Sequence, residues 1–350
     1  MRAATRANTE PASIRIVTKR NGVTVQTLMS LSVKAIAPVI PRNDSAPAVP
    51  LTPLNKWKDT YKKLGTKWCK ANEGMLWGWE GQVWYYDGGR VYVQMADYFR
   101  DPSWEPCAYN ILGQYRDTLL AQKSWNSGWR VFTKGLRMPY ERTGDPRYKD
   151  ALHVLATKSP YAATGGDVRD TFMRETAFIL QAYVDDELAG NGRNPNLERS
   201  VAFLLGHFEA VFETGDFLFH QTFMDGLAAE ALIDYYELTG DPRIPAAIRS
   251  MLDWMWENGW DPATNRLVYN PEPEGDRCSA NNGCQVYKTE LINLIVPAFA
   301  WYWRLSGDAV YARRGDILFS HSLDTDISYS GKIFSQNYRW SPSYVQWRAE

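Results

Sequence analysis

The stretch YYELTGDPRI at residues 235–244 recurs as PYERTGDPRY at residues 139–148, and a looser copy, WYWRLSGDAVY, occupies residues 301–311. In each copy an amphipathic run ends at a Gly-Asp pair, and in two copies a proline follows. Glycine ends a helix because it accepts a positive φ, while Asp-Pro caps and opens the next helix. Thr-Gly-Asp-Pro is therefore predicted to be the tight corner between two antiparallel helices.

Similar corners recur along the chain at roughly 45–50 residues, a spacing typical of repeated two-helix units. They fall near residues 101, 144, 191, 240 and 307. The last one is late because residues 261–285, rich in Asn and Asp, are predicted to form an inserted loop. Five helical hairpins are visible in this way, and residues 311–320 with the tail supply part of a sixth.

The helices before and after a corner differ in polarity. LINLIVPAFAWYW at 291–303 is apolar on nearly all sides, as expected of a helix buried all round. DPRYKDALHVLATK at 145–158 carries more charge, as expected of an outer helix. The sequence thus predicts an all-α fold in which an inner ring of helices lies inside an outer ring, an (α/α) toroid.

The TGDPRY and TGDPRI corners and their spacing resemble the six-hairpin (α/α) toroid superfamily, over roughly residues 60–320. That superfamily includes many glycoside hydrolases and polysaccharide lyases. The resemblance implies a glycan-binding funnel at the end of the toroid where the N-termini of the inner helices converge. It rests on the corners and the spacing and includes no catalytic signature.

Composition limits the other expectations. The 39 basic and 40 acidic side chains nearly cancel, which argues against a nucleic-acid or membrane partner. No run of about twenty apolar residues predicts a membrane span. Fifteen tryptophans and 14% aromatic residues suit either a large core or a sugar-binding surface. The expected partner is a poly- or oligosaccharide, with no cofactor and no metal, and the oligomeric state stays open.

The N-terminal part of the chain is predicted to be separate from the helical body. Residues 1–40 are expected to be extended or β, with Asn21-Gly22 as a hairpin turn, although 23–40 is also faintly like a signal peptide. Residues 41–55 are Pro-rich and predict a linker, so the toroid domain would span 56–350.

The four cysteines are even in number and favour disulfides. Cys69 is predicted to pair with Cys107, and Cys278 with Cys284, although four reduced thiols are the alternative. Two disulfides would place the protein in an oxidising compartment, so a secreted or periplasmic location is expected.

The predicted mouth of the toroid lies about fifteen residues before each corner, because an α-helix rises 1.5 Å per residue. The acidic and imidazole side chains found there are candidate catalytic groups: Glu175, Asp225, His220 and Asp87. Aromatic and charged side chains near them are candidate substrate-binding groups: Tyr85, Tyr86, Trp129, Arg130, Arg169, Lys288, Glu290, Tyr338 and Arg339.

Three functions are compatible with this set. Glu175 and Asp225 on successive inner helices predict a glycoside hydrolase that uses paired carboxylates. His220, Tyr86 and Arg130 are compatible instead with a polysaccharide lyase, in which a base removes the proton α to a uronic-acid carboxylate. A glycan-binding or scaffold protein without catalysis is the third, since acids in a first helical turn also occur for purely structural reasons.

Overall fold

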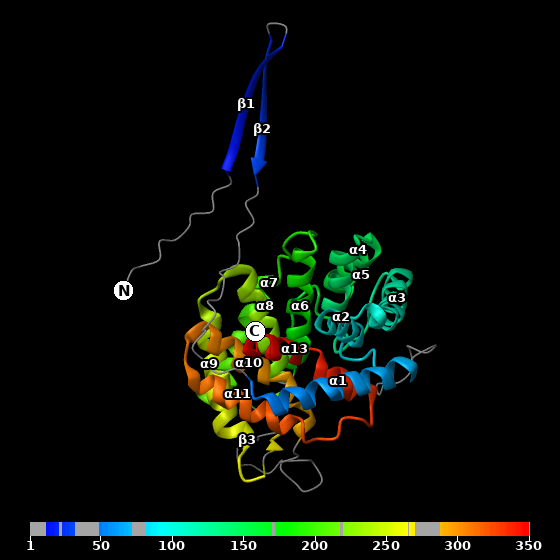
Figure 1. Cartoon of the computed structure of the whole chain (residues 1–350). Coiled ribbons are helices and arrows are strands. Elements are labelled where there is room, and N and C mark those ends of the chain that lie inside the picture. Colours follow the sequence, from blue (N-terminus) through cyan, green and yellow to red (C-terminus); the bar gives the residue numbers. More distant parts are fainter. Residues whose placement is uncertain are drawn as a thin grey trace. The chain divides into compact units, whose positions relative to one another are not determined.

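Helices make up most of the protein. The computed structural model describes residues 12–20, 23–31, 49–71, 82–169, 172–217, 220–264, 266–269 and 288–349, with side chains from residue 49 onward. Within these ranges there are thirteen α-helices and two small two-stranded sheets, which confirms the all-α prediction (Figure 1). The chain divides into two compact units, Met1–Val39 and Ile40–Glu350.

The N-terminal unit contains one antiparallel pair of strands. β1 (Ala12–Arg20) pairs with β2 (Val23–Leu31), so that Arg20 lies opposite Val23. The predicted turn at Asn21-Gly22 lies outside the described residues.

The second unit begins with helix α1 (Leu51–Ala71). The prediction of a linker through residue 55 is therefore wrong for its last five residues, which are helical. Pro53 is compatible with this start because it stands in the first turn, where its missing N–H is not needed. Leu54 and Trp57 then face the interior of the unit.

The three Gly-Asp corners join helices as predicted. They connect α4 (Lys134–Thr143) to α5 (Pro146–Lys158), α8 (Thr222–Thr239) to α9 (Arg243–Trp254), and α10 (Val296–Ser306) to α11 (Ala309–Ser322). Gly144, Gly240 and Gly307 have φ of 71°, 70° and 75°, the left-handed conformation that glycine adopts without strain. The aspartate after each glycine accepts a hydrogen bond from the N–H two residues further on.

The two other corners use different residues for the same purpose. Between α2 (Gly88–Phe99) and α3 (Glu105–Gln122), Arg100 takes the left-handed conformation and Asp101 caps the short 3-10 helix Pro102–Trp104. Between α6 (Met173–Leu188) and α7 (Leu197–Phe208), Gly190 and Gly192 have positive φ.

Helices before the corners contact one another in sequence order. α2 contacts α4, α4 contacts α6, α6 contacts α8, and α8 contacts both α10 and the 3-10 helix Thr289–Leu294 that precedes it. That 3-10 helix contacts α12 (Gly331–Tyr338), which in turn contacts α2. α9, which follows a corner, buries a single face, whereas α6 and α8 are buried on nearly all sides.

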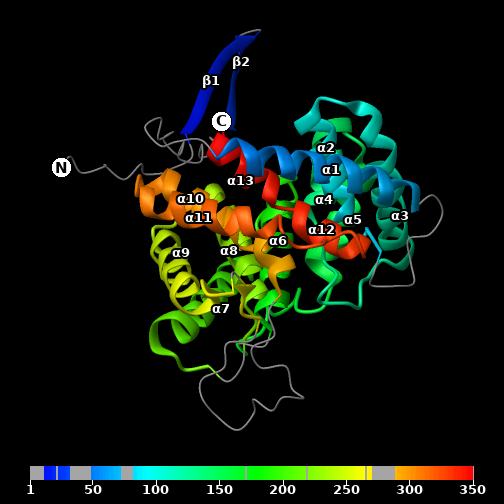
Figure 2. The same cartoon turned by 60° about the horizontal axis from the view of Figure 1, so that its bottom comes forward.

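The C-terminal helices and α1 pack together (Figure 2). α12 ends at Tyr338, and α13 (Ser341–Ala349) follows after Arg339 and Trp340, with Pro342 in its first turn. Tyr61 of α1 stacks on Tyr338 with ring centroids 4.1 Å apart, and Trp57 Nε1 donates to Ser341 Oγ at 3.0 Å. The tail thus forms part of the core.

A disulfide joins α1 to α3. It links Cys69 to Cys107, as predicted, with Cα atoms 5.5 Å apart. The other predicted pair, Cys278 and Cys284, lies outside the described residues.

Two short irregular segments follow the outer helices. The π-helical turns Glu209–Thr214 and Met255–Gly259 continue α7 and α9. The second leads into β3 (Trp260–Asp261), which pairs with β4 (Arg266–Leu267). Most of the predicted insertion at 261–285 lies outside the described residues.

Candidate functional site

The predicted site residues stand where helices begin. Asp87 directly precedes α2, Glu175 lies in the first turn of α6, and Asp225 lies in the first turn of α8. Glu290 lies in the 3-10 helix before α10. Each of these helices therefore has an acidic residue at or next to its start.

A strained turn directs Tyr86 and Asp87 inward. Both residues have left-handed backbones, with φ of 62° and 64°, which is uncommon for side chains larger than glycine. Gly88 makes the turn possible, because a Cβ there would lie 1.8 Å from the carbonyl oxygen of Val83. Strain of this kind concentrates at functional sites, and it places both side chains in the interior.

Tyr86, Arg174 and Glu175 form a buried cluster, which we call the Tyr86 cluster. Arg174 donates from Nε to Glu175 Oε1 at 3.1 Å and from Nη2 to the same oxygen. The guanidinium of Arg174 also lies beside the Tyr86 hydroxyl. Burial raises the pKa of Tyr86, and Arg174 opposes that rise, so the phenol is neutral at ordinary pH.

Glu175 has one carboxylate oxygen to spare. The residue is 5% exposed, and its Oε2 has no hydrogen-bond partner among the described residues. Its Cγ lies close to Gly128, where a Cβ would come within 3.4 Å. Because a buried carboxylate oxygen without a donor is costly, this oxygen is a candidate for contact with a ligand or water.

Aromatic rings lie beside the Tyr86 cluster. The rings of Tyr85 and Tyr86 lie edge to face, 4.9 Å apart, and Phe132 packs against both. The guanidinium of Arg130 lies 5.6 Å from the Tyr85 ring centre, and Lys332 Nζ lies 5.1 Å from it. Cations over aromatic faces are attracted by the ring quadrupole.

His220 and Asp225 form a separate pair. His220 Nε2 lies 3.5 Å from Asp225 Oδ2, and the exposed fractions of the two residues are 1% and 0%. The His220 ring packs against Phe217 and Trp254, at 4.7 and 5.1 Å between centroids. Burial holds the pKa of Asp225 well above its usual range. The pair therefore lies against Trp254 of α9 and against Phe217, in the segment before α8.

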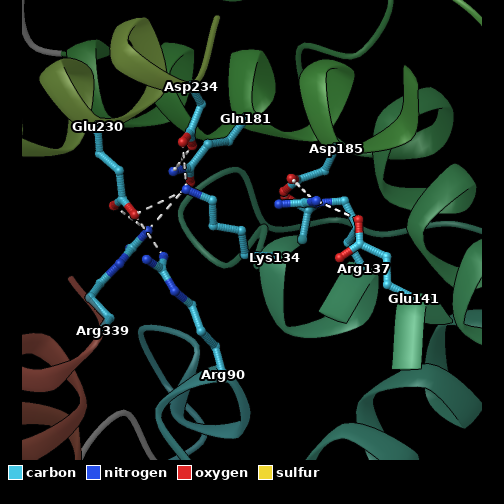
Figure 3. Close-up of polar contacts among 10 residues, drawn as sticks. Arg90, Lys134, Arg137, Glu141, Gln181, Asp185, Glu230, Asp234 and Arg339 are labelled. Carbon is cyan, nitrogen blue, oxygen red and sulfur yellow. Dashed lines mark hydrogen bonds and ion pairs between the residues drawn. The ribbon is translucent and has the colours of Figure 1, made fainter. Parts of the chain in front are cut away.

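Below the Tyr86 cluster, three cations share one carboxylate (Figure 3). Glu230 of α8 accepts from Arg90 Nη1 at 2.7 Å and from Arg339 Nη2 at 2.9 Å, and Lys134 Nζ lies 3.6 Å away. Lys134 also pairs with Asp234 at 2.6 Å. Although burial opposes ionisation, the neighbouring cations lower the pKa of Glu230 below its ordinary value.

Asp87 connects this network to the Tyr86 cluster. Its carboxylate accepts from the Gly135 N–H at 3.1 Å. Burial raises the pKa of Asp87, against the opposing effect of Arg90 and Arg339. Arg339 also opposes the rise in the pKa of Tyr86, so Tyr86 and Asp87 share a cationic neighbour.

A second set of buried ion pairs lies further along α4 and α6. Asp185 accepts from Arg137 Nε at 2.8 Å and from the Thr133 hydroxyl at 2.6 Å, and Arg137 also pairs with Glu141 (Figure 3). Every donor and acceptor named here is matched, so these contacts tie the two helices together.

The remaining predicted residues lie at the periphery or in the core. Trp129 is 42% exposed. Arg169 pairs with Asp167. Lys288 Nζ lies 3.7 Å from Glu290 Oε1. Tyr338 belongs to the core under α1 and does not line the site, because its hydroxyl donates to the Trp57 carbonyl.

The sequence prediction missed Arg90, Lys134 and Glu230. A signal was present, since Glu230 and Asp234 lie four residues apart within the largely apolar middle of α8. Charges placed on one face of a buried helix require partners.

Comparison of the sequence with models of known protein families gives no match, and comparisons with curated proteins and with solved structures give none either. Among the described helices, none is long and apolar enough to cross a membrane.

Proposed function

We propose that the helical unit is an (α/α) toroid and that the protein is a carbohydrate-active enzyme, a glycoside hydrolase acting at the end that holds the Tyr86 cluster. The cyclic order of contacts from α2 through α4, α6, α8, the 3-10 helix Thr289–Leu294 and α12 back to α2 supports the toroid. The difference in burial between the helices on the two sides of each corner supports it as well.

The observation that carries the proposed activity is Glu175. Arg174 holds the carboxylate of Glu175 in place, and the second carboxylate oxygen has no partner among the described residues. Glu175 lies at the start of α6, which the toroid would place in its inner ring, and Tyr86 lies beside Arg174. A fixed carboxylate beside aromatic rings is what a glycosidase presents to a sugar.

Hydrolysis requires a second carboxyl group that is protonated. Burial raises the pKa of both Asp87 and Asp225. We assign the role of proton donor to Asp87, which adjoins Tyr86 in the chain and shares Arg339 with it as a neighbour. Asp225 is instead enclosed with His220. Asp87 would protonate the glycosidic oxygen as its bond to the anomeric carbon breaks, and Glu175 would attack that carbon or take a proton from the attacking water.

The proposal is tested by incubating the protein with a panel of neutral and acidic polysaccharides. Reducing ends and the ultraviolet absorbance of an unsaturated product are measured together. Glu175→Gln is expected to lower turnover at least about 100-fold, the usual size of an acid–base contribution. Asp87→Asn should do the same, Asp225→Asn should act through stability alone, and the exposed Glu209→Gln serves as the control.

Other outcomes assign a different function. An ultraviolet-absorbing product would indicate β-elimination, with Tyr86 beside Arg174 as the base. Binding of a glycan without turnover, lost in Trp129→Ala and retained in Glu175→Gln, would indicate a binding protein. Turnover that survives both Glu175→Gln and Asp87→Asn would overturn the proposed site.

A further inference from the structure

Cationic side chains surround the two tyrosines at this end of the unit. Arg130 and Lys332 lie over the Tyr85 ring, and Lys332 Nζ is also 5.9 Å from the Tyr86 ring centre. Arg174 and Arg339 both lie near the Tyr86 hydroxyl. These four side chains come from three separate parts of the chain, so only the fold brings them together.

The buried guanidinium groups here have more donors than the protein fills. Arg339 is 2% exposed and uses Nη2 to bind Glu230 and Gln181. Its Nε and Nη1 have no partner among the described residues, and neither does Arg90 Nε. An unmatched buried donor is costly, more so when it is charged. An acceptor brought by a ligand would satisfy these groups.

The nearby acids leave these particular donors unfilled. Arg90, Lys134 and Arg339 all lie within 4.0 Å of the single carboxylate of Glu230. Arg174 is matched by Glu175, through one of its oxygens. Lys134 is matched by Asp234, and Asp87 lies near Arg90 and Arg339. The site therefore offers an acidic ligand the unfilled guanidinium donors of Arg339 and Arg90.

We propose that the sugar bound at the Tyr86 cluster carries a carboxylate, so that the substrate is a glycan containing a hexuronic acid, and that Arg174 and Arg339 bind this carboxylate. The proposal rests on the proposed function and names its substrate class. Arginine suits the role because its planar group matches a planar carboxylate. The adjoining tyrosines would contact the apolar face of the same sugar.

The site has an approach for such a ligand. The Arg174 side chain is 20% exposed, whereas Arg339 is buried behind it. Trp129, 42% exposed, stands beside Arg130 at the rim. Arg130, Lys332 and Arg174 are each partly exposed, so these cations are nearer to solvent than Arg339.

Isothermal titration calorimetry compares the binding of two matched sets of oligosaccharides. One is a panel of hexuronic-acid oligosaccharides, and the other is the same oligosaccharides with each carboxyl group reduced to an alcohol. The acidic forms are expected to bind at least about tenfold more tightly, with an affinity that falls as salt is added. Sulfated neutral oligosaccharides of equal length test whether any anion suffices.

Variants of the two arginines test which side chains bind the carboxylate of the ligand. Arg174→Gln and Arg339→Gln are each expected to lower the affinity for the acidic form about tenfold or more and to leave the reduced form unchanged. Arg193→Gln, which removes a half-exposed arginine of a surface ion pair, is the control. If Arg339→Gln does not fold, Lys332→Gln replaces it.

The inference and the proposed function fail in different ways. Equal binding of the acidic and reduced forms, or tighter binding of the sulfated form, overturns the inference. Cleavage of a neutral glycan that depends on Glu175 would do the same while leaving the hydrolase intact. Selective binding of the acidic form without any cleavage would keep the carboxylate site and remove the enzymatic activity.

Discussion

Glu230→Gln is the most informative single change, because it removes the charge that Arg90 and Arg339 share and leaves the shape of the side chain intact. Both arginines are almost fully buried, so water cannot replace the lost carboxylate. Breaking a buried ion pair by removing one partner costs about 3–5 kcal/mol of unfolding free energy. We expect a loss in that range, which would be a large share of the stability of an ordinary domain.

The measurement is urea-induced unfolding followed by tryptophan fluorescence. The midpoint should fall while the dependence of free energy on urea stays constant, since the surface exposed on unfolding does not change. The control is Glu141→Gln, which removes the half-exposed partner of Arg137 and should cost at most about 0.5 kcal/mol. A loss from Glu230→Gln no larger than that of the control would refute the reasoning.

The same variant has a pH dependence of known sign. The ion pairs hold the pKa of Glu230 below its ordinary value. Their contribution is therefore complete above that ordinary value, near 4.3, and is lost as the pH falls toward the folded-state pKa. The stability difference between the wild type and Glu230→Gln should shrink below about pH 4 and stay constant above it.

Three further predictions concern stability. Burial raises the pKa of Asp225, so its carboxyl group lowers stability as the pH rises above its unfolded pKa. Asp225→Asn should therefore raise the melting temperature at neutral pH. A decrease would mean that the group is ionised and paired. Gly144→Ala should lower the unfolding free energy by about 1–2 kcal/mol because the φ of Gly144 is 71°. Gly206→Ala should raise it by about 0.5–1 kcal/mol, because Gly206 lies in a helix with open space where a Cβ would be. Urea unfolding measures both. Reduction of the Cys69–Cys107 disulfide, which spans 38 residues, should cost about 4 kcal/mol, and added reductant should not affect the stability of a Cys69→Ser/Cys107→Ser variant.

Much of the fold follows from local signals in the sequence. The Gly-Asp corners depend on two short-range effects, a left-handed glycine and an aspartate that caps the following turn, and both are readable from a few adjacent residues. The error at residues 51–55 is of the same local kind. A Pro-rich composition favours a linker, but a proline in a first turn is equally compatible with a helix.

The candidate site was only partly predictable. Spacing placed Glu175 and Tyr86 at one end of the helices, and the described contacts bring both to Arg174. Spacing also placed Asp225 at that end, yet its carboxyl group lies against His220 among aromatic rings. A count along a helix fixes the height of a residue but only roughly the direction of its side chain.

The sequence by itself determined the all-α class and the Gly-Asp corners between helices, because these depend on neighbouring residues. Only the tertiary structure decided which charges meet. Arg90 and Glu230 are 140 residues apart, and Glu230 and Arg339 are 109 apart. Their pairing depends on the rotation and packing of whole helices. These are set by the need to pair buried charges across the entire unit, and neighbouring residues do not show which partner each charge will have.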